Sequence, residues 1–207
     1  MFHDMEDFEF QQLRKALSWA ELPDEAWRLL RDIFQVRRLD AKEFAWNPGD
    51  RPRHVYFVVS GLLRYFAGRR RSREYNKVFL WENQFSPPLN SCALDGDLEC
   101  GLQALEPTTV LEADAASFQA LYDKHPAFDR LGRLLGERWL EQKESRALGF
   151  QELSAKDRYQ NFIRDHRDLV QRVSQIHIAS YLGITEVSLS RIRRALARAM
   201  PRTAPAR

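Results

Sequence analysis

The sequence predicts an α+β protein with an N-terminal jelly roll, one long helix and a C-terminal helix-turn-helix. Three observations support this prediction. Short apolar runs separated by turn residues fill residues 35–114, which is typical of antiparallel rolls, barrels and sandwiches. A helical spacing of apolar residues runs from 127 to 150. Two short amphipathic segments then meet at a glycine near the C-terminus.

Composition limits the class of protein. With 44% hydrophobic and 29% charged residues, the 207-residue chain has a globular composition. No apolar run reaches the roughly 18 residues that span a bilayer. The N-terminus, MFHDMEDFEF, lacks the basic and then apolar order of a signal peptide. We therefore expect a soluble cytoplasmic protein with no membrane association.

Three regions are expected along the chain. Residues 1–125 form a β-roll domain with N-terminal helices, 126–150 a long connecting helix, and 151–207 a helix-turn-helix domain. Helical spacing at 8–34 is interrupted by ELPDE, so short helices are expected there. We expect the hinge between the domains at 148–154, where Gly149 and Ser154 interrupt the helical pattern.

Within the β-roll, the stretch HVYFVVSGLLRYFAG at 54–68 contains two apolar runs that are split by Ser60-Gly61. This arrangement predicts an antiparallel hairpin. NPGD at 47–50 is a predicted turn, because proline presets φ and glycine accepts a positive φ. Further strands are expected at 73–81 and 99–114.

An apolar stripe marks the long helix. Its members recur every three or four residues: Phe128, Leu131, Leu135 and Trp139. Two interpretations remain open. The stripe covers the β-domain of its own chain, or it packs against the same helix of a second copy.

Capping residues delimit the C-terminal helices. Ser174 precedes QIHIASYL, Gly183 supplies a left-handed turn at little cost, and Thr185 precedes EVSLSRIRRALA. Ser154 with Asp157 predicts a capping box on the helix before them. The apolar residues expected to join the two helices are Ile178, Ala179, Leu182, Leu189, Ile192 and Leu196.

Charge is shared unevenly along the chain. Residues 1–149 hold 21 Lys and Arg against 24 Asp and Glu, whereas residues 150–207 hold 11 against 5. A basic segment with this helical pair indicates DNA binding, with the second helix in the major groove. An αα-hairpin without a DNA role is the alternative. We expect Arg191 to read guanine O6 and N7, and Ser188 and Arg194 to bind phosphates.

These segments resemble the superfamily of the cyclic-AMP receptor protein and the fumarate–nitrate regulator (Crp/Fnr), which are bacterial transcription regulators. Residues 44–67 are similar to its β-roll, since NPGD is followed by VYFVVSG and then by LLRYF. The order of β-roll, long helix and helix-turn-helix also matches. The resemblance implies a cyclic-nucleotide-binding-like sensor domain, a dimerisation helix and a winged helix-turn-helix that binds double-stranded DNA as a homodimer.

The resemblance places Glu186, Val187, Ser190 and Arg191 at base-facing positions. Val187 stands where the family usually has glutamate. Valine touches only a thymine methyl group, whereas glutamate accepts from cytosine N4, so the usual half-site is not expected. The full set of expected DNA-binding residues is Ser174, Gln175, Thr185, Glu186, Val187, Ser188, Ser190, Arg191 and Arg194.

Family members that bind cyclic AMP hold it with a glycine turn, a glutamate and an arginine of the roll. The corresponding region here, 83–105, has Pro87-Pro88 in place of the glycine and contains no Lys or Arg. A phosphate group would meet the carboxylates of Asp95, Asp97 and Glu99, so we expect no cyclic-nucleotide binding. A pocket for an effector that the sequence does not identify is expected at Phe85, Ser86, Leu89, Asn90, Ser91 and Cys92.

The sequence gives little indication of a metal site, a cofactor site or an active site. Cys92 and Cys100 are the only cysteines, so they complete neither a tetrahedral zinc site nor a four-thiolate iron–sulfur site. They are either small thiols or a redox pair. No Gly-rich phosphate loop, HExxH or GxSxG motif occurs. We expect no catalytic residue, no cofactor and no metal.

Two functions remain in competition. The first is a dimeric transcription regulator whose partners are double-stranded DNA, a second copy of the chain and RNA polymerase. The second is a sensor or interaction module whose C-terminal helices bind protein. Substitution of Arg191 by alanine separates them, since only the first function loses DNA affinity.

Overall fold

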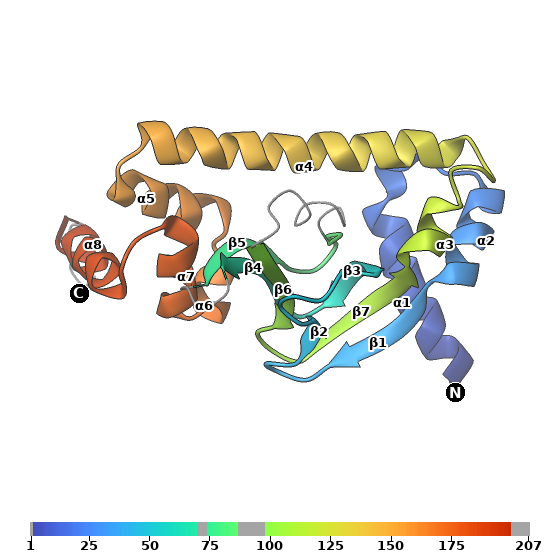
Figure 1. Cartoon of the computed structure of the whole chain (residues 1–207), viewed down its shortest axis with the longest axis horizontal. Helices are drawn as coiled ribbons and strands as arrows, with labels where there is room; N and C mark the ends of the chain where they lie inside the picture. The colour runs from blue at the N-terminus through green and yellow to red at the C-terminus, as the bar shows by residue number, and fades with distance from the viewer. Residues whose placement is uncertain (1, 70–73, 87–97, 200–207) are drawn as a thin grey trace, which may run out of the picture. The chain divides into compact units, whose positions relative to one another are not determined.

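A computed structural model describes residues 2–69, 74–86 and 98–199 of the chain (Figure 1). The chain divides into two compact units, Met1–Lys143 and Glu144–Arg207. This division falls inside the long helix α4 (Ala127–Glu152), so the last turns of α4 belong to the second unit.

The first unit begins with helices, as the spacing at 8–34 predicts. They are α1 (Phe2–Ala16), the 3-10 helix η1 (Ser18–Ala20) and α2 (Asp24–Ile33). The strands that follow are β1 (Gln35–Leu39), β2 (Phe44–Trp46), β3 (His54–Ser60), β4 (Leu63–Arg69), β5 (Tyr75–Leu80), β6 (Leu98–Ala104) and β7 (Thr108–Asp114). After β7 come the short helix α3 (Ala115–Gln119) and then α4.

The strands form two antiparallel sheets, in the orders β1-β7-β3 and β2-β6-β4-β5. β3 contributes to two apolar cores, because successive side chains of a strand point to opposite faces. Phe57 and Val59 join a core with the helices, whereas Tyr56 and Val58 join a core that contains side chains of both sheets. The predicted β-roll is thus confirmed as a two-sheet structure with helices packed on one sheet.

The predicted hairpin over 54–68 is wrong. β3 pairs with β7, whereas β4 pairs with β5 and β6, so the two apolar runs lie in different sheets. Gly61 turns the chain between them with φ +97°, and a Cβ there would lie 2.6 Å from Cα of Thr108. A strand with buried side chains on both faces has a continuous apolar sequence. Such a sequence does not indicate which strand it pairs with, so the hairpin could not be distinguished from the observed pairing.

The apolar stripe of α4 packs on its own unit. Phe128 and Leu131 are buried in the core that contains the N-terminal helices, and Leu135 packs against it. Trp139 packs against the core between the sheets. Of the two interpretations of this stripe, coverage of the chain's own β-domain is therefore the correct one.

The second unit consists of the end of α4 and four further helices. These are α5 (Ala155–Asp165), α6 (Leu169–Arg172), α7 (Gln175–Leu182) and α8 (Glu186–Ala199). The helix-turn-helix is confirmed in α7 and α8. Among residues 144–199 no strand occurs, so the wing that the resemblance implies is not found there. α6 lies between α5 and α7, and its Leu169 is buried.

No helix in the part of the chain that the structure describes is long and apolar enough to cross a membrane.

Candidate nucleic-acid interface

The turn between α7 and α8 is built from local interactions. Ser174 and Thr185 cap the two helices, and their hydroxyl groups accept backbone N–H bonds at 3.4 and 3.1 Å. Gly183 has φ +68°, and its N–H donates to carbonyl groups in the last turn of α7. All three roles match the sequence prediction. Each of these hydrogen bonds joins residues no more than four positions apart in the chain, so the limits of α7 and α8 follow from local sequence.

α8 buries one face and exposes the opposite one. Leu189 is fully buried, and Ile192 and Leu196 are half-buried. Since successive residues of a helix are about 100° apart, the opposite side is a second stripe with the same period. This exposed stripe consists of Val187, Arg191, Arg194 and Arg198. Three guanidinium groups and one apolar side chain therefore form a continuous row along the solvent-exposed side of α8.

The expected base-facing residues are brought together on this side of α8. Val187 is 60% exposed, and Arg191 lies one turn further along the same stripe. Glu186, in the first turn, is exposed, and Ser190 is half-buried at the edge of the stripe. Arg198 also lies on the stripe but was not among the predicted residues. The signal was present, because Arg198 follows Arg194 by four residues and Arg191 by seven.

The residues expected at phosphates lie in different settings. Arg194 is exposed on the stripe, whereas Ser188 is half-buried and about 90° away from it around the helix. The Ser188 hydroxyl lies 2.9 Å from the Thr185 hydroxyl, so it takes part in the helix cap. Ser174 and Gln175 are exposed at the start of α7.

The second unit is basic as a whole. Residues 144–207 contain 12 Lys and Arg against 6 Asp and Glu, a net charge of +6. Among the described residues, no ion pair joins Arg191, Arg194 or Arg198 to a carboxylate.

The expected effector pocket is described only in part, because Leu89, Asn90, Ser91 and Cys92 lie outside the described residues. Phe85 lines a cavity of about 260 Å³ between the end of β5, the N-terminal helices and α4. Ser86 does not line it. Its hydroxyl accepts the backbone N–H of Tyr56 at 3.1 Å, so it fastens the chain to β3.

The side chain of Cys100 is buried in β6 and is disulfide-bonded. The hydroxyl of Tyr65 donates to its sulfur at 3.3 Å. Cys100 is therefore not a free thiol in the structure. Cys92, the other cysteine in the sequence, lies outside the described residues. Among the residues that are described, no group of three or more His, Cys, Asp or Glu could hold a metal ion.

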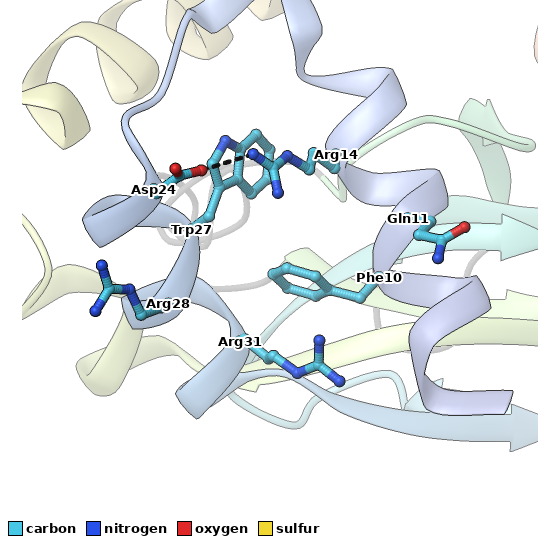
Figure 2. Close-up of a pocket in the computed structure, with 7 residues that line it drawn as sticks. All are labelled: Phe10, Gln11, Arg14, Asp24, Trp27, Arg28 and Arg31. Atoms are coloured by element: carbon cyan, nitrogen blue, oxygen red, sulfur yellow. Dashed lines mark hydrogen bonds and ion pairs between the residues drawn. The ribbon is translucent and has the colours of Figure 1, made fainter. Parts of the chain in front are cut away.

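A second hollow, of about 480 Å³, lies between α1 and α2 (Figure 2). Three arginines line it, and two of them contact other side chains of the hollow. Arg14 donates to Asp24 at 2.7 Å and lies 5.5 Å from the Trp27 ring, and Arg31 lies 5.6 Å from the Phe10 ring. These contacts join the two helices, and we assign the cluster to the packing of the first unit.

Comparison with known proteins identifies the fold. The chain matches no protein-family model and no curated protein. Among solved structures, it is similar to FixK2 from Bradyrhizobium japonicum, with a TM-score of 0.68 and 17% identity over 80% of this chain and 85% of that one. It is equally similar to a protein from Eubacterium rectale described as a transcriptional regulator of the crp/fnr family, with a TM-score of 0.68 and 16% identity over 87% and 86%.

A third similar structure is CLP, the c-di-GMP responsive global regulator from Xanthomonas campestris. Its TM-score is 0.64, with 18% identity over 85% of this chain and 92% of that one. These matches cover most of both chains. The chain therefore has the fold of the Crp/Fnr superfamily.

Proposed function

We propose that the protein is a DNA-binding transcription regulator, acts as a homodimer, and reads a near-palindromic site through α8. The observation that carries the proposal is the exposed stripe of Val187, Arg191, Arg194 and Arg198, opposite the buried face of α8. A helix with this division of faces enters the major groove with its arginines against bases and phosphates. The fold shared with Crp/Fnr regulators supports the same function.

Each residue of the stripe has a role set by its chemistry. Arg191 pairs with guanine O6 and N7, and Val187 contacts a thymine methyl group. Arg194 binds a backbone phosphate, which positions the helix without selecting a sequence. Ser190 and Glu186 contact bases beside the stripe. Ser174 and Gln175, at the start of α7, contact phosphates. Thr185 and Ser188, at the start of α8, lie close to the DNA backbone.

The homodimer is proposed to form along α4. The stripe on the core side of α4 is occupied by its own unit, so a second copy meets the other side, where Leu140 is 57% exposed. Beside it, a Cβ placed at Gly136 would have no neighbour within 4 Å, which leaves room for a close helix–helix approach. Two copies of α8 then read half-sites about 34 Å apart.

The sensor domain is proposed to bind no cyclic nucleotide. RNA polymerase is the proposed protein partner on DNA. No residue is assigned a catalytic role. The competing function, a protein-binding module, has no supporting observation beyond the exposure of α8.

The test begins with selection of bound sites from fragmented genomic DNA by the purified chain, which yields the half-site and its spacing. Arg191→Ala is then expected to weaken binding to that site by about 1–3 kcal/mol and to relax its preference for guanine at one position. Arg194→Ala is expected to weaken binding to all sequences alike. Recovery of no enriched sequence, or equal affinity of the wild-type chain and Arg191→Ala, would contradict the proposal.

A further inference from the structure

The C-terminus of α7 is held by two arginines from other helices of the second unit. Arg146, from the last turns of α4, donates from Nη2 to the carbonyl oxygen of Tyr181 at 2.9 Å. Arg158, from α5, donates from Nε and Nη2 to the carbonyl oxygen of Leu182 at 3.3 and 3.2 Å. Carbonyl groups in the last turn of a helix have no partner within the helix and carry partial negative charge, so guanidinium donors suit them.

Both guanidinium groups also lie against one aromatic ring. The Cζ atoms of Arg146 and Arg158 lie 5.3 and 4.9 Å from the ring centre of Phe150, and Arg146 lies 4.4 Å from the ring of Tyr181. Nη1 of Arg158 further donates to the carbonyl oxygen of Leu153 at 2.7 Å. The end of α4, the start of α5 and the end of α7 are thus tied together at one point.

This point lies only a few residues before α8. α7 packs on α8, and Ala179 of α7 and Leu189 of α8 are fully buried, so those two helices are fixed to each other. It does not fix how the pair stands relative to the end of α4. The contacts of Arg146 and Arg158 do so together with the packing of α7 on α5, where the rings of Phe162 and Tyr181 lie 5.5 Å apart. The two arginines bind the carbonyl groups that immediately precede the Gly183 turn.

We infer that Arg146 and Arg158 are positioning residues for DNA recognition, which set the orientation of the α7–α8 pair on the end of α4. The inference rests on the proposed function. In a dimer formed along α4, that orientation decides whether both copies of α8 reach their half-sites together. Binding to a full palindrome therefore depends on Arg146 and Arg158, whereas binding to a single half-site depends on them much less.

The test uses the full-length chain with Arg146→Gln and Arg158→Gln, and with Arg164→Gln as the matched control. Arg164 is an exposed arginine of α5 whose guanidinium pairs with Asp165, so its loss changes the charge of the same unit equally. Affinity is measured by fluorescence anisotropy for a full palindrome and for a single half-site, at several salt concentrations. Circular dichroism checks that each variant is folded at the assay temperature.

The two variants are expected to lose about tenfold or more in affinity for the palindrome and less than about threefold for the half-site, since fork-shaped, charge-assisted contacts are lost. The dependence of affinity on salt is expected to stay unchanged. Arg164→Gln is expected to change both affinities less than about twofold. If a glutamine variant fails to fold, Arg158→Lys and Phe150→Leu replace it, because they keep a long or an apolar side chain in place. These variants are expected to lose affinity for the palindrome more than for the half-site, by a smaller factor.

Three results would overturn the inference. Equal losses on the palindrome and the half-site indicate general destabilisation. Equal losses of affinity, together with a salt dependence that is weaker by the amount expected for about one phosphate contact, indicate that the arginines touch DNA directly. Unchanged binding indicates no role. If the wild-type chain itself selects no DNA sequence, the proposed function fails, and the inference fails with it. If the wild-type chain binds DNA and the variants bind equally well, only the inference fails.

Discussion

The ring of Phe150 lies against Gly183, the residue that turns the chain from α7 into α8. A Cβ built at Gly183 would meet Cε1 of Phe150 at 2.8 Å, and the backbone there has φ +68°. Two separate reasons therefore exclude a larger residue at this turn: the left-handed backbone and the ring beneath it.

Gly183→Ala is expected to lower the free energy of unfolding of the second unit by about 2–3 kcal/mol, since the strained φ and the contact with Phe150 act together. Gly149→Ala is the control. It lies in the interior of α4, where an added Cβ meets only Leu153 at 3.8 Å, and should raise stability by about 0.5–1 kcal/mol. Urea denaturation followed by circular dichroism measures both. A neutral Gly183→Ala would show that the turn repacks freely.

Val187→Glu is expected to change which base is preferred at one position of each half-site. A valine offers only an apolar contact to thymine, whereas a glutamate accepts from cytosine N4, and such a contact discriminates by about 1–3 kcal/mol. Sequence selection from a randomised pool with both proteins measures the change. Ala197→Glu adds the same carboxylate at an exposed position of α8 outside the stripe, so it serves as the control. Identical selected sites for Val187→Glu and the wild-type chain would place residue 187 away from the bases.

Leu140→Lys is expected to weaken the dimer, because it puts a charge into the proposed apolar contact between two copies of α4. Sedimentation velocity is expected to show a shift toward monomer, with a loss of affinity for palindromic sites. Phe8→Lys is a closely matched control. Phe8 lies on α1 and has the same exposed fraction as Leu140, 57%, so the oligomeric state should not change. A dimer that persists in Leu140→Lys excludes this face of α4.

The stability of the second unit is expected to fall with decreasing pH because of His166. Burial lowers the pKa of His166 below its ordinary value of 6.5, although the charge of Asp165 opposes this effect. The neutral form is therefore favoured by folding, so its contribution is fully present above pH 6.5 and is lost as the pH falls toward the lowered pKa.

The midpoint of thermal unfolding, measured at pH 7.5 and at intervals down to pH 5, checks this expectation. His166→Gln removes the titrating group and should flatten the profile over that range, whereas His125→Gln, in the first unit, should leave the slope of the second unit unchanged. A wild-type profile that is already flat below pH 6.5 contradicts the prediction.

Local sequence patterns were sufficient to predict the helices and the exposed face of the candidate site. Ser174, Gly183 and Thr185 act on backbone groups within a few residues of themselves, so their spacing predicts where α7 and α8 begin and end. The exposed stripe of α8 follows from helical periodicity alone. Arg198 was missed although it obeys that periodicity.

The sequence by itself thus determined the order of the elements, the helix-turn-helix and the basic character of the second unit, because each depends on neighbours along the chain. Only the tertiary structure decided three other features. It paired β3 with β7 instead of β4, it packed the stripe of α4 on its own cores, and it brought Arg146 and Arg158 to the end of α7. These features join residues far apart in sequence, and their free energy comes from burial and hydrogen bonds that no local pattern encodes.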